Sequence, residues 1–219
     1  MSTPAFESRE AIVAVAQALD RAGHMPNKSG NVSCRSAAGL LITPSGVPYS
    51  DLAPQQIIEI ELDGTVVAGG EGLRPSSEWP MHAAVYARRP GFAAIVHTHS
   101  PGATALACAH RGIPAFHYMI ALAGGEIRCM PYATFGTAEL AERAVLGLEQ
   151  RRATLLANHG VVAAGRSLRE ARSVALEVEN LAGEYLALLA AGLEPAVLDE
   201  EEMRVVIAKF TDYGRIDPE

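Results

Sequence analysis

The sequence predicts an α/β fold in which helices and strands alternate through the 219 residues of the chain. Two observations carry this prediction. Apolar residues recur at helical spacing in several segments, and short apolar runs bounded by glycine, proline or polar turn residues stand between them. Because the chain is long enough to bury one substantial core and contains no repeat or long linker, we expect residues 1–219 to form a single layered domain.

The first third of the chain is expected to begin with a helix and to continue mostly as sheet. Ser8 can cap an amphipathic helix that ends near Gly23. Four short strands follow, in the segments NVSCR, LLITPSG, IIEIEL and TVVAGG. The last two are joined by Asp63-Gly64, which is typical of a tight hairpin turn.

The middle of the chain is expected to alternate helix and strand. Ser77 precedes the helical segment EWPMHAAVYARR, in which Pro80 is tolerated because it lies in the first turn. A strand in FAAIVHTH, a short helix in GATALACAH and a strand near EIRCM follow.

The last third is expected to contain two strands and three helices, and each helix has a capping residue. Thr137 can cap AELAERAVLGLEQ, and Asp199 can cap a final helix that ends at Phe210. Ser167 and Glu170 form a capping-box pattern before the long helix LREARSVALEVENLAGEYLALLA. The run ATLLANHGVVAAG gives two strand segments broken at residues 158–160.

Composition and charge exclude several classes of partner. The formal net charge is -7 and no basic stripe is present, so we expect no nucleic-acid partner. No apolar run is long enough to span a membrane, and MSTPAFESREAIV lacks the basic head and apolar centre of a signal peptide, so a cytoplasmic location is expected. Cys34, Cys108 and Cys129 form neither a CxxC pair nor a disulfide framework, and we interpret them as reduced packing residues.

Two histidines in one buried strand indicate a metal site. His97 and His99 lie two residues apart, so their rings leave the same face of the strand and can converge on one point. Zinc sites usually need a third protein ligand, and His159 is the best candidate, because Gly160 beside it would let the backbone pass close to a metal. The alternative is that each is a hydrogen-bonded core residue.

The remaining histidines are interpreted first as ordinary structural residues. They are His24, His82, His110 and His117, of which His117 is the least ordinary because it adjoins Tyr118.

A carboxylate and several small polar residues stand near this predicted metal site. Glu78 can act as acid or base beside an open metal position. Ser76 and Ser77 at a helix start can bind phosphate or simply cap the helix. The segments SGNVS and TPSG are likewise typical either of turns or of phosphate-binding loops.

Eight segments, in order and over nearly the whole chain, resemble the class II aldolase and adducin family. They are GNVS, ITPSG, PSSEW, IVHTH, IPAFHYMIALAGG, PYATFGT, ATLLANHG and VLDEEEMRVVIAKFTDYG. The resemblance implies a three-layer fold with a central, mostly antiparallel sheet and helices on both faces. It is closest to the sugar-phosphate aldolases of that family.

The resemblance also implies roles for particular residues. His97, His99 and His159 match the ligands of one Zn²⁺ per chain, for which Mn²⁺ or Co²⁺ is an alternative, and Glu78 matches a metal-ligating residue that becomes the catalytic acid and base. Tyr118 matches a catalytic tyrosine donated by the neighbouring subunit of a homotetramer. The phosphate-binding positions fall on Gly30, Asn31, Ser45, Gly46, Ser76 and Ser77, and positions near the aldehyde end fall on Phe135, Phe210 and Tyr213.

The implied reaction is the retro-aldol cleavage of a ketose 1-phosphate to dihydroxyacetone phosphate and an aldehyde. The substrate would resemble L-fuculose 1-phosphate or a 5-deoxy- or 5-methylthiopentulose 1-phosphate. No Schiff-base lysine is needed, and the chain has only Lys28 and Lys209. Pro26 and Lys28 depart from the small uncharged residues of the family, which leaves the shape and phosphate affinity of this loop open.

Other functions remain possible on the sequence alone. The same fold serves methylthioribulose-1-phosphate dehydratases and ribulose-phosphate 4-epimerases, although the epimerases carry aspartate where Glu78 stands. A non-catalytic adducin-like interaction module would be expected to lose metal ligands. A simple metal-binding protein would hold zinc without turnover.

Overall fold

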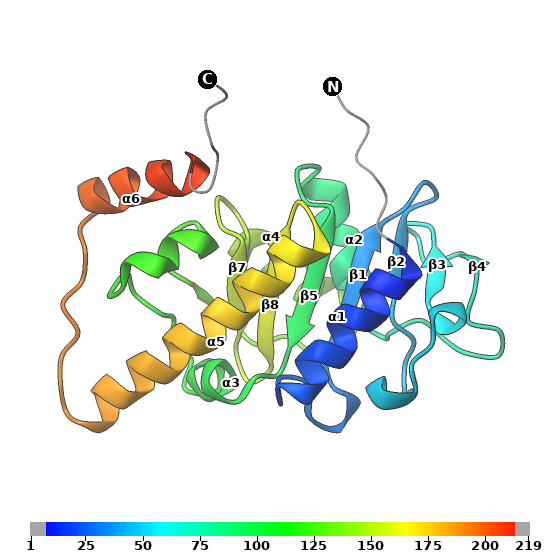
Figure 1. The fold of residues 1–219 in the computed structure, drawn as a ribbon, viewed down its shortest axis with the longest axis horizontal. Helices are drawn as coiled ribbons and strands as arrows, with labels where there is room; N and C mark the ends of the chain where they lie inside the picture. The colour runs from blue at the N-terminus through cyan, green and yellow to red at the C-terminus, as the bar shows by residue number, and fades with distance from the viewer. Residues whose placement is uncertain (1–7, 213–219) are drawn as a thin grey trace, which may run out of the picture.

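The computed structural model describes residues 8–212, which form one eight-stranded sheet with helices on both faces (Figure 1). The strands are β1 (Asn31–Arg35), β2 (Leu40–Ile42), β3 (Ile58–Ile60), β4 (Val66–Ala68), β5 (Ala94–Thr98), β6 (Cys129–Met130), β7 (Ala153–Leu156) and β8 (Gly160–Gly165). The helices are α1 (Arg9–Arg21), α2 (Trp79–Arg88), α3 (Pro101–Cys108), α4 (Ala138–Gly147), α5 (Leu168–Ala190) and α6 (Glu200–Asp212). The predicted α/β class is confirmed.

The sheet is antiparallel except at one edge. Its strand order is β4-β3-β2-β1-β5-β8-β7-β6, and only the β6–β7 pair is parallel. In the β1–β5 pair Asn31 lies opposite His97, so the two side chains leave the same face of the sheet as direct neighbours. This register is the first element of the functional site.

Alternation along the central strands separates two apolar layers. On β5, Val96 packs into the cluster that contains α1, α3 and α5, whereas Ile95 packs into the cluster that contains α2 and α4. Figure 1 shows α1 and α5 crossing the near face of the sheet, with α2 and α4 behind it. His97 follows the alternation of Ile95 and therefore faces α2 and α4, where its side chain is fully buried.

Most of the predicted helix starts are confirmed by capping hydrogen bonds. The side chains of Ser8, Thr137, Ser167 and Asp199 each accept from a backbone N–H three residues further on. The start of α2 differs, because the N-cap is Glu78 rather than Ser77.

Two further differences lie outside the predicted caps. Helix α6 continues to Asp212, beyond the predicted end at Phe210. Residues Tyr118–Ala123 form a 3₁₀ helix that periodicity did not indicate.

Two sequence expectations about cysteines and membranes can be compared with the described residues. Cys34, Cys108 and Cys129 are free thiols, and Cys34 is buried and Cys129 half-buried, whereas Cys108 is exposed and differs from the expected packing residue. In the part of the chain from 8 to 212, no helix combines the length and the apolar character that a bilayer span requires.

Two glycines let the chain pass close to the end of β5. A Cβ atom at Gly160 would lie 2.4 Å from the carbonyl oxygen of Thr98 and 2.9 Å from the ring of His99. At Gly30, where φ is +77°, a Cβ atom would lie 2.5 Å from the carbonyl oxygen of His97. The expected close approach of the Gly160 backbone is therefore to the end of β5 and to the ring of His99.

Replacing Gly160 by alanine should therefore destabilise the protein, by about 1–3 kcal/mol for an overpacked site. Gly183→Ala is the matched control, because Gly183 lies inside α5 with no atom within 4 Å of the added Cβ. The control should leave stability unchanged or raise it by about 0.4–1 kcal/mol. Urea unfolding of both variants checks this, and equal midpoints would contradict the close approach at Gly160.

Candidate active site

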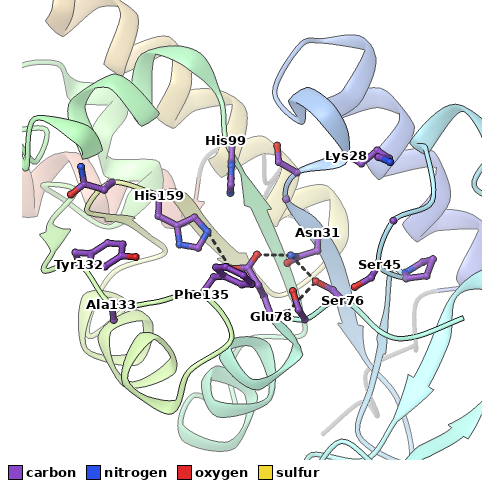
Figure 2. A pocket seen from close by; sticks show the side chains of 16 residues that line it. Lys28, Asn31, Ser45, Ser76, Glu78, His99, Tyr132, Ala133, Phe135 and His159 are labelled. Atoms are coloured by element: carbon purple, nitrogen blue, oxygen red, sulfur yellow. Dashed lines mark hydrogen bonds and ion pairs between the residues drawn. The ribbon is translucent and has the colours of Figure 1, made fainter.

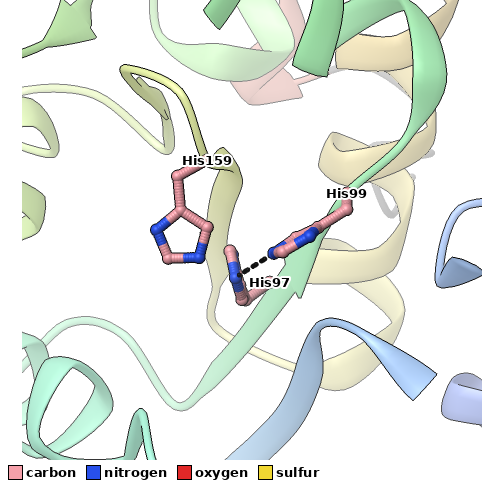
Figure 3. Close-up of side chains that lie close together, drawn as sticks. All are labelled: His97, His99 and His159. Carbon is pink, nitrogen blue, oxygen red and sulfur yellow. Dashed lines mark hydrogen bonds between the residues drawn. The ribbon is translucent and has the colours of Figure 1, made fainter. Parts of the chain in front are cut away.

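Three histidine rings converge at the end of β5 (Figure 3). His97 lies on β5, His99 follows the strand directly, and His159 comes from the turn between β7 and β8. The Nε2 atoms of His97 and His99 are 3.0 Å apart, and each pair of ring centroids is 4.8 or 4.9 Å apart. The predicted convergence of these three residues is confirmed.

The tautomer of His97 is determined by a backbone acceptor. Its Nδ1 lies 2.8 Å from the carbonyl oxygen of Val161, which can only accept, so Nδ1 carries the proton. In the neutral ring, Nε2 therefore presents a lone pair toward His99 and His159. Such an outer hydrogen bond is the usual way in which a metal-binding histidine is oriented.

Glu78 lies between two of these rings. Its Oε2 is 3.1 Å from His97 Nε2, and its Oε1 is 3.1 Å from His159 Nε2. Burial raises the pKa of the Glu78 carboxyl, but the charges of His97 and His159 outweigh burial and hold this pKa well below its ordinary value. The carboxylate in turn raises the pKa of His97 although burial acts against it.

The donor set fits a divalent cation. Imidazole nitrogens and carboxylate oxygens with free lone pairs repel one another at such distances unless protons or a metal lie between them. Glu78 Oε1 is buried, and although His159 Nε2 lies 3.1 Å away, no described residue donates to this oxygen with good hydrogen-bond geometry. Burial, and then the charges of His97 and His159, lower the pKa of His99 to about 3, so its ring is neutral and available as a ligand. These residues form a possible three-histidine metal site with a carboxylate beside it.

Asn31 connects the carboxylate to the neighbouring loop. Its Nδ2 donates to Glu78 Oε2 at 2.9 Å and to Ser76 Oγ at 3.0 Å. Ser76 Oγ also accepts from the backbone N–H of Glu78 at 3.3 Å. Ser45 Oγ donates to the carbonyl oxygen of Pro75 at 3.0 Å, which joins two of the loops expected to bind phosphate.

These groups open into a cavity of about 390 Å³ (Figure 2). One end is lined by Lys28, Ser29, Gly30, Asn31, Pro44, Ser45, Gly46, Ser76 and Ser77, and the centre by Glu78, His99 and His159, with Asn158 also in the lining. Figure 2 shows Tyr132 and Ala133 at the other end and Phe135 beside Glu78. All six residues predicted to bind phosphate line the first end. His97 lies beneath the centre with no exposed surface.

Two predicted site residues lie elsewhere. Tyr118 is 53% exposed on its 3₁₀ helix, and it does not line the cavity of its own chain. Its ring centroid lies 4.9 Å from that of His117 and 6.2 Å from that of Phe210. Phe210 is thus near Tyr118 rather than in the cavity. Tyr213 lies outside the described residues.

Several lining residues were missed by sequence reasoning. Lys28 has φ +66° and follows Asn27 with φ +55°, so two left-handed residues bring a cation to the phosphate end. Asn158 has φ +53° and accepts through Oδ1 from His110 Nε2 at 2.6 Å. Asparagine beside glycine is typical of such a turn, which is the signal that could have indicated Asn158.

A carboxylate next to converging imidazoles, below loops rich in N–H and hydroxyl groups, defines a protein that carries out metal-assisted chemistry on a small anionic substrate. The family model described as Class II Aldolase and Adducin N-terminal domain matches residues 10–186. The chain belongs to this family.

Three relatives illustrate the similarity. A 5-methylthioribulose-1-phosphate/5-deoxyribulose-1-phosphate aldolase of Rhodospirillum rubrum is 47% identical over 94% of this chain and 92% of its own length. The L-fuculose phosphate aldolase of Escherichia coli is 47% identical over 90% of each chain. A solved structure of an L-fuculose 1-phosphate aldolase superposes with a TM-score of 0.89 at 38% identity, covering 93% of this chain and 95% of its own.

The geometry predicts that binding of a metal ion requires all three histidines of the cluster. Wild-type protein should bind about one zinc ion per chain. Zinc should also raise the unfolding temperature, because the ion binds only the folded state. His99→Ala should lose both effects, and His24→Ala, a histidine outside the cluster, should retain them. Elemental analysis and thermal unfolding with and without zinc check this, and full binding by His99→Ala would contradict it.

Proposed function

We propose that the protein is a zinc-dependent aldolase that cleaves a ketose 1-phosphate into dihydroxyacetone phosphate and an aldehyde. One observation carries this proposal: the cavity has a hydroxyl- and amide-lined end, the histidine and Glu78 cluster at its centre, and an aromatic end opposite (Figure 2). This order matches phosphate, reacting carbons and aldehyde along the substrate. The relatives at 47% identity are aldolases of sugar 1-phosphates.

The phosphate is proposed to lie between three loops. Gly30 with Asn31, Ser45 with Gly46, and Ser76 with Ser77 offer N–H and hydroxyl donors, which suit a phosphate dianion. The ammonium of Lys28 adds a positive charge at the same end. Binding energy from the phosphate would position the carbon atoms at the cluster, which raises the rate as well as the affinity.

Zinc held by His97, His99 and His159 would supply positive charge where cleavage of the C3–C4 bond leaves negative charge. Glu78 is anionic at neutral pH, because its pKa lies below the ordinary value. In cleavage the Glu78 carboxylate would first take up a proton, which balances the one that the C4 hydroxyl releases to Tyr118 and solvent. It would then give this proton to C3 of the dihydroxyacetone phosphate half. In the condensation direction Glu78 removes that proton.

Tyr118 is proposed to serve the site of a neighbouring chain in a homotetramer. There its phenolate would take the proton of the C4 hydroxyl in cleavage, and its hydroxyl would return a proton to that oxygen in condensation. Its 53% exposure and its absence from the lining of its own chain's cavity support this assignment. Residues 1–219 are proposed to act as one domain in this assembly.

The aldehyde half is expected to end in an apolar group. Tyr132 lines that end of the cavity and Phe135 lies beside Glu78 in the same lining, and both rings are more than half exposed (Figure 2). Apolar side chains suit a deoxy or methylthio terminus better than a hydroxylated one. The two kinds of relative are equally identical to this chain, so identity alone does not separate their substrates.

A coupled assay of dihydroxyacetone phosphate release tests the function, using L-fuculose, 5-deoxyribulose and 5-methylthioribulose 1-phosphates and their unphosphorylated forms. Release is expected only from the phosphorylated sugars. Loss of water without dihydroxyacetone phosphate would indicate a dehydratase, and an epimerised pentulose phosphate would indicate an epimerase. Zinc binding without turnover of any substrate would favour a binding protein.

Glu78→Gln should separate metal binding from proton transfer in that assay. The three histidines remain, so zinc content should stay near wild type, while kcat should fall about 10²–10⁴-fold because the acid and base is lost. Glu142→Gln is the control, since Glu142 is an exposed carboxylate that pairs with Arg88 at 3.3 Å. A parental rate for Glu78→Gln would show that Glu78 is only a helix-start residue.

Mixed oligomers test whether Tyr118 acts between chains. Tyr118→Phe and Glu78→Gln homo-oligomers should each be weakly active, for different missing groups. Co-refolding the two should recover about a quarter of wild-type activity. A site is intact only when one chain supplies Glu78 and its neighbour supplies Tyr118, and random mixing meets each condition about half of the time. Hybrids verified by mass that recover no activity would reject the shared site.

A further inference from the structure

A row of buried polar side chains lies behind Asn31, on the side away from the cavity. His82 on α2 has no exposed surface, and its Nε2 lies 2.5 Å from Asn31 Oδ1. His82 Nδ1 lies 2.6 Å from Ser33 Oγ, and Ser33 Oγ lies 2.8 Å from the hydroxyl of Tyr86. His82 was interpreted from the sequence as an ordinary core histidine, and the function proposed above does not use it.

Local periodicity places these four residues. Asn31 and Ser33 are two residues apart on β1, so both leave the same face of the sheet. His82 and Tyr86 are four residues apart on α2, so both lie on the helix face that packs against that sheet face. The two polar side chains on β1 and the two on α2 are therefore spaced so that each can meet a partner on the other element.

Only one assignment of donors and acceptors fits the hydrogen bonds between Asn31, His82 and Ser33. Asn31 Nδ2 donates to Glu78 and to Ser76, so Asn31 Oδ1 faces His82 and must accept. His82 Nε2 must then carry a proton. Burial, with a smaller effect from the charge of His97, lowers the pKa of His82 to about 3, so the ring is neutral. Its Nδ1 therefore accepts from Ser33.

The other tautomer and the other amide orientation are both unfavourable. A proton on His82 Nδ1 would turn the Nε2 lone pair toward Asn31 Oδ1 at 2.5 Å. Rotating the amide to relieve that contact would turn Oδ1 toward the carboxylate of Glu78. Either arrangement leaves buried acceptors facing each other, which is more costly than a satisfied network.

We propose that His82, held by Ser33 and Tyr86 with its proton on Nε2, is a positioning residue that turns the Asn31 amide toward Glu78 and Ser76. The inference rests on the proposed function, because Glu78 and Ser76 are the groups assigned to proton transfer and phosphate binding. One amide thereby orients both groups. Loss of His82 should raise KM and lower kcat together.

Two replacements of His82 distinguish positioning from packing. His82→Gln keeps an N–H donor near the position of Nε2, whereas His82→Leu removes both hydrogen bonds at similar bulk. His82→Leu should lower kcat/KM about 10–100-fold, the usual loss when a residue that orients an active-site group is removed, and His82→Gln should regain most of it. Met81→Leu is the control for altered packing of α2, because Met81 is buried on the same helix and makes no part of this row.

Further measurements separate orientation from stability. Urea unfolding of each variant gives its stability, and zinc content should remain near one per chain in all of them. Equal kcat/KM for His82→Gln and His82→Leu would overturn the proposal. If His82→Leu does not fold, Tyr86→Phe replaces it, with a smaller loss expected because only the far end of the row is removed.

Nitrogen NMR of the wild-type protein gives a test that needs no turnover. The His82 ring should be neutral, with Nε2 protonated and Nδ1 bare. A proton on Nδ1 would overturn the proposal. Affinity for inorganic phosphate should fall in His82→Leu and recover in His82→Gln. Absence of aldolase activity in the wild type would reject the proposed function, whereas the orientation of Asn31 would still be decided by the NMR spectrum and by phosphate affinity.

Discussion

The buried carboxylate of Glu78 between His97 and His159 is the interaction on which the rest of the site depends. A charge removed from water costs several kcal/mol unless charges and hydrogen bonds compensate it. Each compensating group comes from a different part of the chain: His97 from β5, His159 from the β7–β8 turn, and Asn31 from β1. The hydrogen bonds and charges that stabilise the Glu78 carboxylate therefore connect the start of α2 to three segments of the sheet.

The sheet holds these side chains in fixed positions relative to one another. The β1–β5 register places Asn31 directly opposite His97, and hydrogen bonds on both sides of β5 limit its movement. Gly30 and Gly160 allow neighbouring backbone to approach the end of β5 more closely than any side chain would permit. Groups held by strands are positioned more rigidly than groups held by loops, so His97, which lies on β5, is the most rigidly positioned of the three histidines.

The two ends of the cavity are built differently from its centre. The end proposed to bind phosphate consists of loops whose small residues can present N–H and hydroxyl groups to a ligand, and Lys28 is the basic side chain of its lining. The opposite end carries the exposed ring of Tyr132. Tyr118 is exposed on a separate 3₁₀ helix, so the chemistry proposed for it requires a second chain. The centre can act on the carbon atoms common to several substrates, while the ends distinguish among them.

Local sequence pattern was sufficient to predict most of the helices and strands and to single out the three histidines that converge. Helix caps, strand alternation and the spacing of His97 and His99 are local, because each depends on contacts within a few residues, and the structure agrees with them. Residue types also singled out Glu78 and the small-residue loops, and the resemblance to a family assigned roles to them. Local sequence pattern did not predict the N-cap of α2, which is Glu78 rather than Ser77.

Which distant residues meet depends on the tertiary structure. His82 has the appearance of any core histidine until the packing of α2 on β1 joins it to Asn31, 51 residues away. Gly160 approaches the end of β5 and the ring of His99, and Tyr118 does not line the cavity of its own chain. These outcomes depend on strand register and on the packing of layers, which are determined by many long-range contacts at once and leave no periodic signal in the segments concerned.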